Sequence, residues 1–259
     1  MTMINFKTPL AALAVLTMAL TSSSAFSAGD TPKPPKHDWS FSNVFGTFDK
    51  AAAQRGFQVY KEVCSACHSM ELLSYRHLSG IGFSEEEIKA IAATVDVTDG
   101  PNDEGEMFER PGTPADRFVS PFPNKKAAAA SNNGKAPPDL SLMTKARFNG
   151  SDYVYALLTG YKDVAPAHIE VPEGGNYNAY FPGHIIAMAP PLSDDSVEYT
   201  DGTKATLAQH AEDVTTFLSW AAEPEMEARK SLGVKVLLFL LILTGMLYAV
   251  KREVWKDQH

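Results

Sequence analysis

The chain has 259 residues, of which 44% are hydrophobic and 21% are charged, and its formal net charge at pH 7 is -8. This composition is ordinary for a globular protein and excludes wholesale disorder. The negative charge argues against nucleic acid as a partner, and it suits either a basic partner or solubility alone. The length allows one large domain or two small ones.

Residues 1–28 have the features of a secretory signal peptide. Lys7 precedes a short apolar core over residues 9–20, and a run of mostly small residues follows over 21–28. The apolar core is too short to span a bilayer as a helix. We therefore predict that residues 1–28 are removed on export and that residues 29–228 form a domain outside the cytoplasm.

The exported domain is predicted to be mainly α, with long loops between its helices. Asp49 and Ser84 are candidate N-caps, and Gly160 is expected to end a helix. The predicted helices cover residues 49–60, 84–94, 125–132, 151–159 and 206–220. Residues 165–191 hold many glycines and prolines and are expected to be irregular throughout.

A second apolar run covers residues 232–250 and ends at Lys251 and Arg252. A spanning helix needs about 20 residues, and this run reaches that length if Lys235 extends its ammonium to the membrane surface. The uninterrupted part is apolar on all sides, which argues against a buried helix of a soluble protein. We predict a transmembrane anchor over residues 229–251 and a cytoplasmic tail over 252–259. The signal peptide is bacterial in style, which places a single-pass protein in the bacterial cytoplasmic membrane with its large domain in the periplasm.

The chain has two cysteines, and both lie in the motif Cys64-Ser65-Ala66-Cys67-His68. The pattern Cys-x-x-Cys-His is typical of covalent haem attachment. Each thiol adds across a vinyl group of the porphyrin, and the adjacent His68 is positioned to bind the iron. The motif therefore predicts one c-type haem.

Three other interpretations of the motif are weaker. A thioredoxin-like thiol pair would follow a strand and would need a first cysteine with a low pKa. A structural zinc site would need further cysteine or histidine ligands at suitable spacing. A disulfide between Cys64 and Cys67 would close too short a loop to stabilise a large domain, and it would leave His68 without a role.

The second axial ligand is less certain from the residues alone. Methionine favours a high-potential electron carrier, whereas an open position favours a haem enzyme or a ligand sensor. Met70 is too close to His68 along the chain to reach the other side of a haem, and Met143 has the surroundings of a core residue. Met188 and His184 share a loop with glycine and proline and are the two candidates. The methionines considered are Met70, Met107, Met143, Met188 and Met226.

Ten short stretches carry a resemblance to a known family. They are residues 57–64, 67–70, 75–78, 99–102, 105–108, 132–134, 137–141, 180–183, 188–191 and 229–230. Together they resemble the cytochrome c1 family, the haem subunits of quinol–cytochrome c reductase (cytochrome bc1) complexes, over nearly all of the mature length. The resemblance implies a c-type cytochrome fold with long loop insertions and one C-terminal transmembrane helix.

The resemblance also implies specific roles for residues of this chain. His68 and Met188 would be the two iron ligands of one covalent haem c. Arg147 and Tyr153 would lie near the haem propionates, and Asn132 and Pro138 would line the pocket. The implied cofactor-binding set is Cys64, Cys67, His68, Met188, Arg147, Tyr153, Asn132 and Pro138.

By the same resemblance, the chain is an electron-carrying subunit and no enzyme on its own. Its implied partners are a cytochrome b, a Rieske iron–sulfur protein, the lipid bilayer and a soluble or membrane-bound cytochrome c. The acidic residues within 85–109 and 194–201 are candidates for steering a basic cytochrome c. A solvated face is the alternative explanation for these charges.

Overall fold

The computed structural model describes residues 32–258 of the chain and is mainly helical. The predicted signal peptide, residues 1–28, lies outside the described residues. The α-helices are α2 (Lys50–Glu62), α3 (Glu85–Ala92), α4 (Lys125–Ala130), α5 (Gly150–Thr159), α6 (Leu207–Ala222) and α7 (Met226–Val254). Short 3₁₀ helices cover Cys64–Ala66, Tyr75–Ile81 and Lys256–Gln258.

The helices begin where the capping residues predict. The Asp49 carboxylate accepts a hydrogen bond from the Ala52 N–H, and Thr206 caps α6 through its hydroxyl. Ser84 and Glu87 form a reciprocal capping box at the start of α3. Gly160 follows α5 directly. All five helices predicted before the apolar C-terminal run are confirmed, with ends that differ by a few residues.

The core is built where α2 crosses α6. A Cβ atom at position 56 would clash with the backbone carbonyl of Asp213, so Gly56 permits the close approach of the two helices. Next to this crossing, Arg55 donates to both carboxylate oxygens of the buried Asp213 at 2.9 Å. Phe57 packs edge-on against Phe217 of α6. The crossing therefore joins the first helix of the described chain to the last helix of the exported domain.

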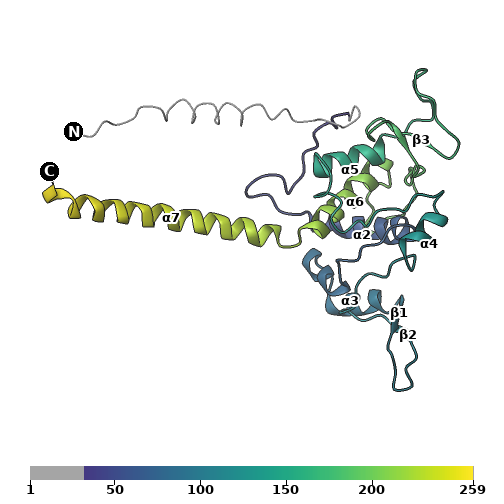
Figure 1. The fold of residues 1–259 in the computed structure, drawn as a ribbon, viewed down its shortest axis with the longest axis horizontal. Helices are drawn as coiled ribbons and strands as arrows, with labels where there is room; N and C mark the ends of the chain where they lie inside the picture. The colour runs from purple at the N-terminus through teal and green to yellow at the C-terminus, as the bar shows by residue number, and fades with distance from the viewer. Residues whose placement is uncertain (1–31, 259) are drawn as a thin grey trace, which may run out of the picture.

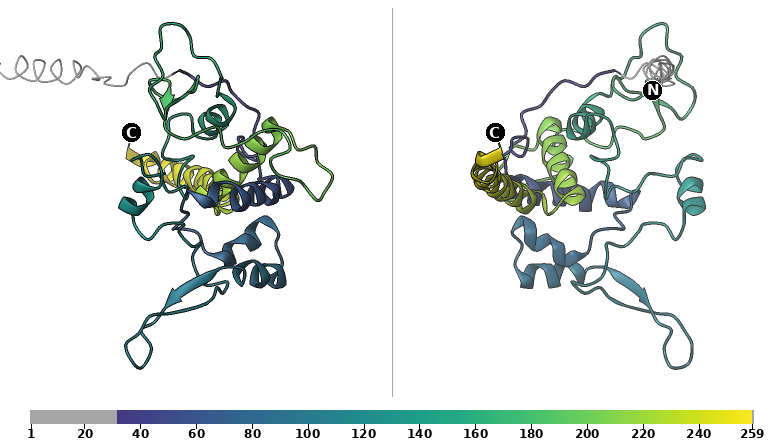
Figure 2. Two further views of the ribbon diagram at one scale, coloured as in Figure 1. Left: turned by 90° about the vertical axis from the view of Figure 1, so that its right-hand side faces the viewer. Right: turned by 60° about the vertical axis from the view of Figure 1, so that its left-hand side comes forward.

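Two small antiparallel hairpins flank the helical centre, as Figure 2 shows. In the first, β1 (Asp96–Asp99) pairs with β2 (Phe108–Pro111). In the second, β3 (Asn176–Tyr177) pairs with β4 (Ile185–Ile186). The prediction that residues 165–191 are irregular throughout is wrong at this second hairpin. Strands of two residues are too short to show the alternating pattern by which strands are predicted.

Helix α7 extends away from the rest of the protein (Figure 1). Its 29 residues have a length of about 43 Å at 1.5 Å per residue, more than the hydrocarbon core of a bilayer. None of its apolar stretch is buried within the described residues. The prediction of a mainly α fold with one apolar C-terminal helix that can span a membrane is confirmed. The helix also extends beyond the predicted anchor at both ends.

Candidate functional site

The Cys-x-x-Cys-His motif forms a tight turn directly after α2. Cys64 starts the 3₁₀ turn, and its carbonyl accepts hydrogen bonds from the N–H groups of Cys67 and His68. Both cysteines are free thiols; Cys64 is half-buried and Cys67 is exposed. Two thiols and an imidazole are thus presented by a single turn of backbone.

The state of the first thiol argues against a redox-active cysteine pair. Burial raises the pKa of the Cys64 thiol to about 12, and the nearby Cys67 adds to the effect. A thiol oxidoreductase needs a first cysteine with a lowered pKa, because the thiolate is the nucleophile. The motif also follows a helix rather than a strand. The thioredoxin-like interpretation therefore lacks both of its requirements.

His68 is held in one orientation and one tautomer. Its Nδ1 lies 2.8 Å from the carbonyl oxygen of Pro138. A carbonyl can only accept, so Nδ1 carries the proton and Nε2 keeps a free lone pair. Burial lowers the pKa of His68, against the opposing effects of Pro138 and Asp139, which favours the neutral ring. A neutral imidazole whose other nitrogen donates to a carbonyl is the usual form of a metal-binding histidine.

Asp139 joins the segment that follows the cysteine motif to the segment around Pro138. Its role was not predicted from the sequence. Its carboxylate accepts from the Ser69 hydroxyl at 2.9 Å and from the Glu71 N–H at 2.8 Å. It also accepts from the Ser141 N–H at 2.9 Å. Partial burial acts to raise the pKa of Asp139, but these hydrogen bonds outweigh it and hold the pKa below its ordinary value. The only signal in the sequence was the stretch at residues 137–141.

Met188 lies in the loop that follows β4 and is half-buried. The hydroxyl of Tyr161 donates to the Met188 carbonyl at 3.1 Å. Asn178, fully buried, organises the turn between β3 and β4, which precedes this loop. Its amide donates to the Leu157 carbonyl of α5, and its oxygen accepts from the N–H groups of Tyr180 and Phe181.

The other candidate ligands have different surroundings. Met70 is 0% exposed in the core, and Met226 is also buried. Met143 packs against the core, as predicted for it, and Met107 is exposed. His184 stacks on Tyr177, with its Nδ1 3.3 Å from the Asn178 carbonyl.

The predicted pocket residues fall into two groups. Pro138 contacts His68 directly, and the buried Tyr153 is close to Tyr161, the residue that holds Met188. Asn132 and Arg147 make their side-chain hydrogen bonds locally, to the carbonyls of Ala128 and Ala146. Neither of these two side-chain hydrogen bonds connects its residue to the cysteine motif. Arg147 is exposed, and its charge acts to lower the pKa of Tyr153 against the larger effect of burial.

Several of the predicted docking acids are already paired within the protein. Asp99 binds Arg110, which also binds Asp116 outside the predicted set, and Asp201 binds Arg55. Asp194 accepts from the Leu207 N–H at the start of α6. The acids without an ion pair among the described residues include Glu85, Glu86, Asp103, Glu104, Glu106 and Glu109.

The donor set fits a c-type haem. The motif supplies two free thiols on one turn and an imidazole whose Nε2 is available, and the loop after β4 supplies a half-buried methionine. Thiolate or thioether sulfur and imidazole nitrogen are the ligands that haem iron takes from proteins.

Comparison with known proteins identifies close relatives. A sequence model of the cytochrome C1 family matches residues 39–258. The chain is 54% identical over 237 residues to cytochrome c1 of Rhodospirillum rubrum, an alignment that covers 86% of this chain and 87% of that protein. It is 52% identical over 236 residues to the mitochondrial cytochrome c1 heme protein of Schizosaccharomyces pombe, covering 89% and 76%. It is also 50% identical over 248 residues to cytochrome b/c1 of Bradyrhizobium diazoefficiens; that alignment covers 88% of this chain and 36% of the longer protein.

Proposed function

The chain belongs to the cytochrome c1 family, the haem-carrying electron-transfer subunits of the cytochrome b–c1 complex, and on that premise we propose its place in the electron path. It accepts electrons from a Rieske iron–sulfur protein and passes them through one covalent haem to a soluble cytochrome c. A cytochrome b is its other partner in the complex. The observation that carries the proposal is the tautomer of His68, which leaves Nε2 free beside two thiols.

Each residue of the proposed site has a separate task. When bound, a haem supplies one-electron chemistry at its iron. Cys64 and Cys67 would hold the porphyrin through thioether bonds, and the short turn would fix the spacing of their sulfurs. His68 would bind the iron through Nε2, and the Pro138 carbonyl would raise the basicity of the ring. Met188 would supply the second protein ligand of the iron.

The remaining pocket residues are proposed to act on the haem edge. Arg147 is exposed, so its guanidinium is free to form paired hydrogen bonds with a propionate. Tyr153, buried beside Tyr161, would donate its hydroxyl from the protein side. Asn132 lines the pocket from the end of α4, where its amide is tied to Ala128.

The topology of the protein follows from α7 and the signal peptide. We place residues 29–228 in the periplasm, the anchor at 229–251 across the bacterial cytoplasmic membrane, and residues 252–259 in the cytoplasm. The unpaired acids of the β1–β2 hairpin and of the start of α3 form the surface that attracts a basic cytochrome c.

The docking surface has a direct test. Electron delivery to a basic cytochrome c should slow as ionic strength rises, because salt screens long-range attraction. Replacing Glu104 and Glu106 by glutamine should weaken this salt dependence. The paired Asp201, replaced by asparagine, is the matched control. A transfer rate that does not change with salt concentration would show that these acids do not attract the cytochrome c.

The proposed cofactor and ligands are tested together by spectroscopy of the full chain extracted from membranes. A pyridine haemochrome spectrum should show a c-type haem, and carbon monoxide should leave the reduced spectrum unchanged. A c-type haem that binds carbon monoxide at once would instead indicate an open site, as in a haem enzyme or a gas sensor. Absence of covalent haem would refute the proposal.

A further inference from the structure

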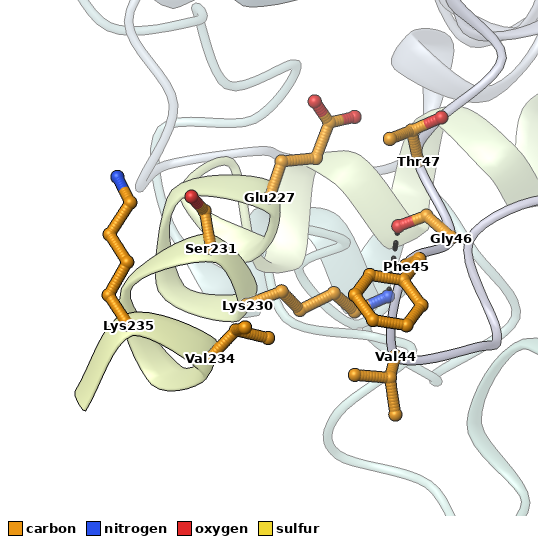
Figure 3. Close-up of a pocket in the computed structure, with 9 residues that line it drawn as sticks. All are labelled: Val44, Phe45, Gly46, Thr47, Glu227, Lys230, Ser231, Val234 and Lys235. Atoms are coloured by element: carbon orange, nitrogen blue, oxygen red, sulfur yellow. Dashed lines mark hydrogen bonds between the residues drawn. The ribbon is translucent and has the colours of Figure 1, made fainter. Parts of the chain in front are cut away.

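The segment before α2 folds back onto the beginning of α7. In Figure 1 this segment, in purple, reaches alongside α7 beyond the rest of the exported domain. We call residues 41–47 the interfacial loop. Together with Glu227, Lys230 and Lys235 of α7, part of it lines a hollow of about 300 Å³ (Figure 3).

The loop is fastened to α7 by its backbone. The Lys230 ammonium donates to the carbonyls of Phe41, Asn43 and Gly46 at 2.7, 2.6 and 3.1 Å. A lysine has three donors, so these three carbonyls satisfy it completely. One turn earlier in α7, the Glu227 carboxylate accepts from the Phe48 N–H at 2.8 Å. Three carbonyls of the loop and the N–H that follows it are therefore fixed to α7.

The apolar side chains of the loop are directed outward. Val44 is 65% exposed and Phe45 is 82% exposed, although the backbone on both sides of them is bonded to α7. Both line the hollow beside Val234 and Lys235, which belong to the apolar run that starts at residue 232. A rigid pair of exposed apolar residues usually marks a surface that another apolar phase covers.

The position of the loop relative to α7 indicates which apolar phase covers Val44 and Phe45. Val44 and Phe45 lie level with the first residues of the apolar run of α7, where a spanning helix enters the bilayer. Lys235 makes no ion pair within residues 32–258, and Figure 3 shows its side chain turned away from the loop. A lysine at such a depth extends to the lipid phosphates. Aromatic and basic residues together are typical of the membrane interface.

We propose that the interfacial loop enters the headgroup layer of the bilayer, with Val44 and Phe45 among lipid chains and Lys235 against lipid phosphate. The exported domain is then held to the membrane at two points, α7 and the loop. This fixes the domain's tilt, which a single helix leaves free. The inference needs α7 to span the membrane and is independent of the electron path.

The test uses single cysteine variants of the haem-loaded full chain in phosphatidylcholine vesicles. Phe45→Cys is modified with a nitroxide, and its collisions with dissolved oxygen and with a water-soluble nickel chelate are compared by electron paramagnetic resonance. Val164→Cys, also 82% exposed and in the segment between α5 and β3, is the aqueous control. Leu237→Cys, within the apolar run, is the membrane control.

We expect the nickel chelate to reach the label at position 45 several-fold less often than the label at 164, with oxygen collisions closer to those at 237. Equal nickel access at 45 and 164 would overturn the inference. A label at 45 that neither reagent reaches would mean that protein covers the loop, which also overturns it. Nickel access at 237 would remove the premise that α7 spans the bilayer.

A second variant tests the fastening of the loop. With the label at 45, Lys230→Met should narrow the spectral lines because the loop loses its three carbonyl contacts, whereas Lys235→Met should not. Equal line widths in the two variants would contradict a rigid loop. The unsubstituted chain should take up no label, because its two cysteines are proposed to hold haem. Labelling there would count against the proposed function and leave the interfacial loop untouched.

Discussion

The segment after the cysteine motif and the turn between β3 and β4 are each organised by one polar side chain, but in different ways. Asp139 is charged and half-buried, and it accepts three hydrogen bonds. Asn178 is neutral and 0% exposed, and it accepts two and donates one. A carboxylate with no cationic partner is tolerated where water still reaches it, whereas the fully buried Asp213 needs its ion pair with Arg55. Asn178 has no such partner, and a neutral amide with hydrogen bonds suits its burial. Each irregular loop thus has a hub suited to its depth.

The largest effect is expected at the buried hub. Asn178→Ala removes a donor and leaves the N–H groups of Tyr180 and Phe181 without an acceptor, which should lower the free energy of unfolding by roughly 3 kcal/mol. Guanidinium unfolding of the haem-loaded chain measures the change. Asn176→Ala, two residues away in the half-buried β3, is the matched control. Equal losses in the two variants would contradict the hub.

A smaller loss of stability is expected at the half-buried hub, Asp139. Asp139→Ala should lower the free energy of unfolding by about 2 kcal/mol, since water can replace part of what the carboxylate provides. Asp139→Asn keeps an acceptor and should lose less. The same unfolding measurement applies. If alanine here cost more than alanine at Asn178, burial would not be what separates the two hubs.

The next prediction concerns the contact that holds the proposed ligand. Tyr161→Phe removes the hydroxyl that donates to the Met188 carbonyl and should cost about 1 kcal/mol of stability. It should also let carbon monoxide bind to the reduced protein, which the unsubstituted protein resists, because the loop of Met188 is loosened. Tyr180→Phe is the control, because the Tyr180 hydroxyl has no hydrogen bond in the described part of the chain. An unchanged response to carbon monoxide would show that the hydrogen bond from Tyr161 to Met188 does not control access to the iron.

The smallest expected effect is on the pH dependence of stability. Asp116 is a third hub of the charged kind; the Arg110 guanidinium and the Thr113 N–H hold its pKa well below the ordinary 3.8. A lowered pKa in the folded state means that its contribution is complete above pH 3.8 and is lost as the pH falls below it. Asp116→Asn should flatten the acid side of the stability profile, and Asn178→Ala should leave its shape unchanged. Other acids with lowered pKa values, such as Asp139, will still give an acid limb. A limb as steep in Asp116→Asn as in the unsubstituted chain would contradict this prediction.

The elements that could be predicted from the sequence are those whose signals are local. Asp49, Ser84 and Thr206 cap helices within three residues of themselves, and the cysteine motif is contiguous. The Asp139 hub could not be predicted, because its partner Ser69 is 70 residues away. Lys230 is further still, 189 residues from the Phe41 carbonyl that it binds. Such contacts depend on the tertiary fold and leave no pattern along the chain.

The helix crossing at Gly56 has a consequence for biogenesis. Arg55 and Asp213, which pair at the crossing, are 158 residues apart, and the cysteine motif follows directly after α2. During synthesis the motif is therefore made long before α6, and for that time α2 lacks the partner that buries its apolar face. We expect the two thiols to stay open to an attachment machinery throughout that interval. Because α6 is made late, the domain can close only after the chain has been made almost as far as α7.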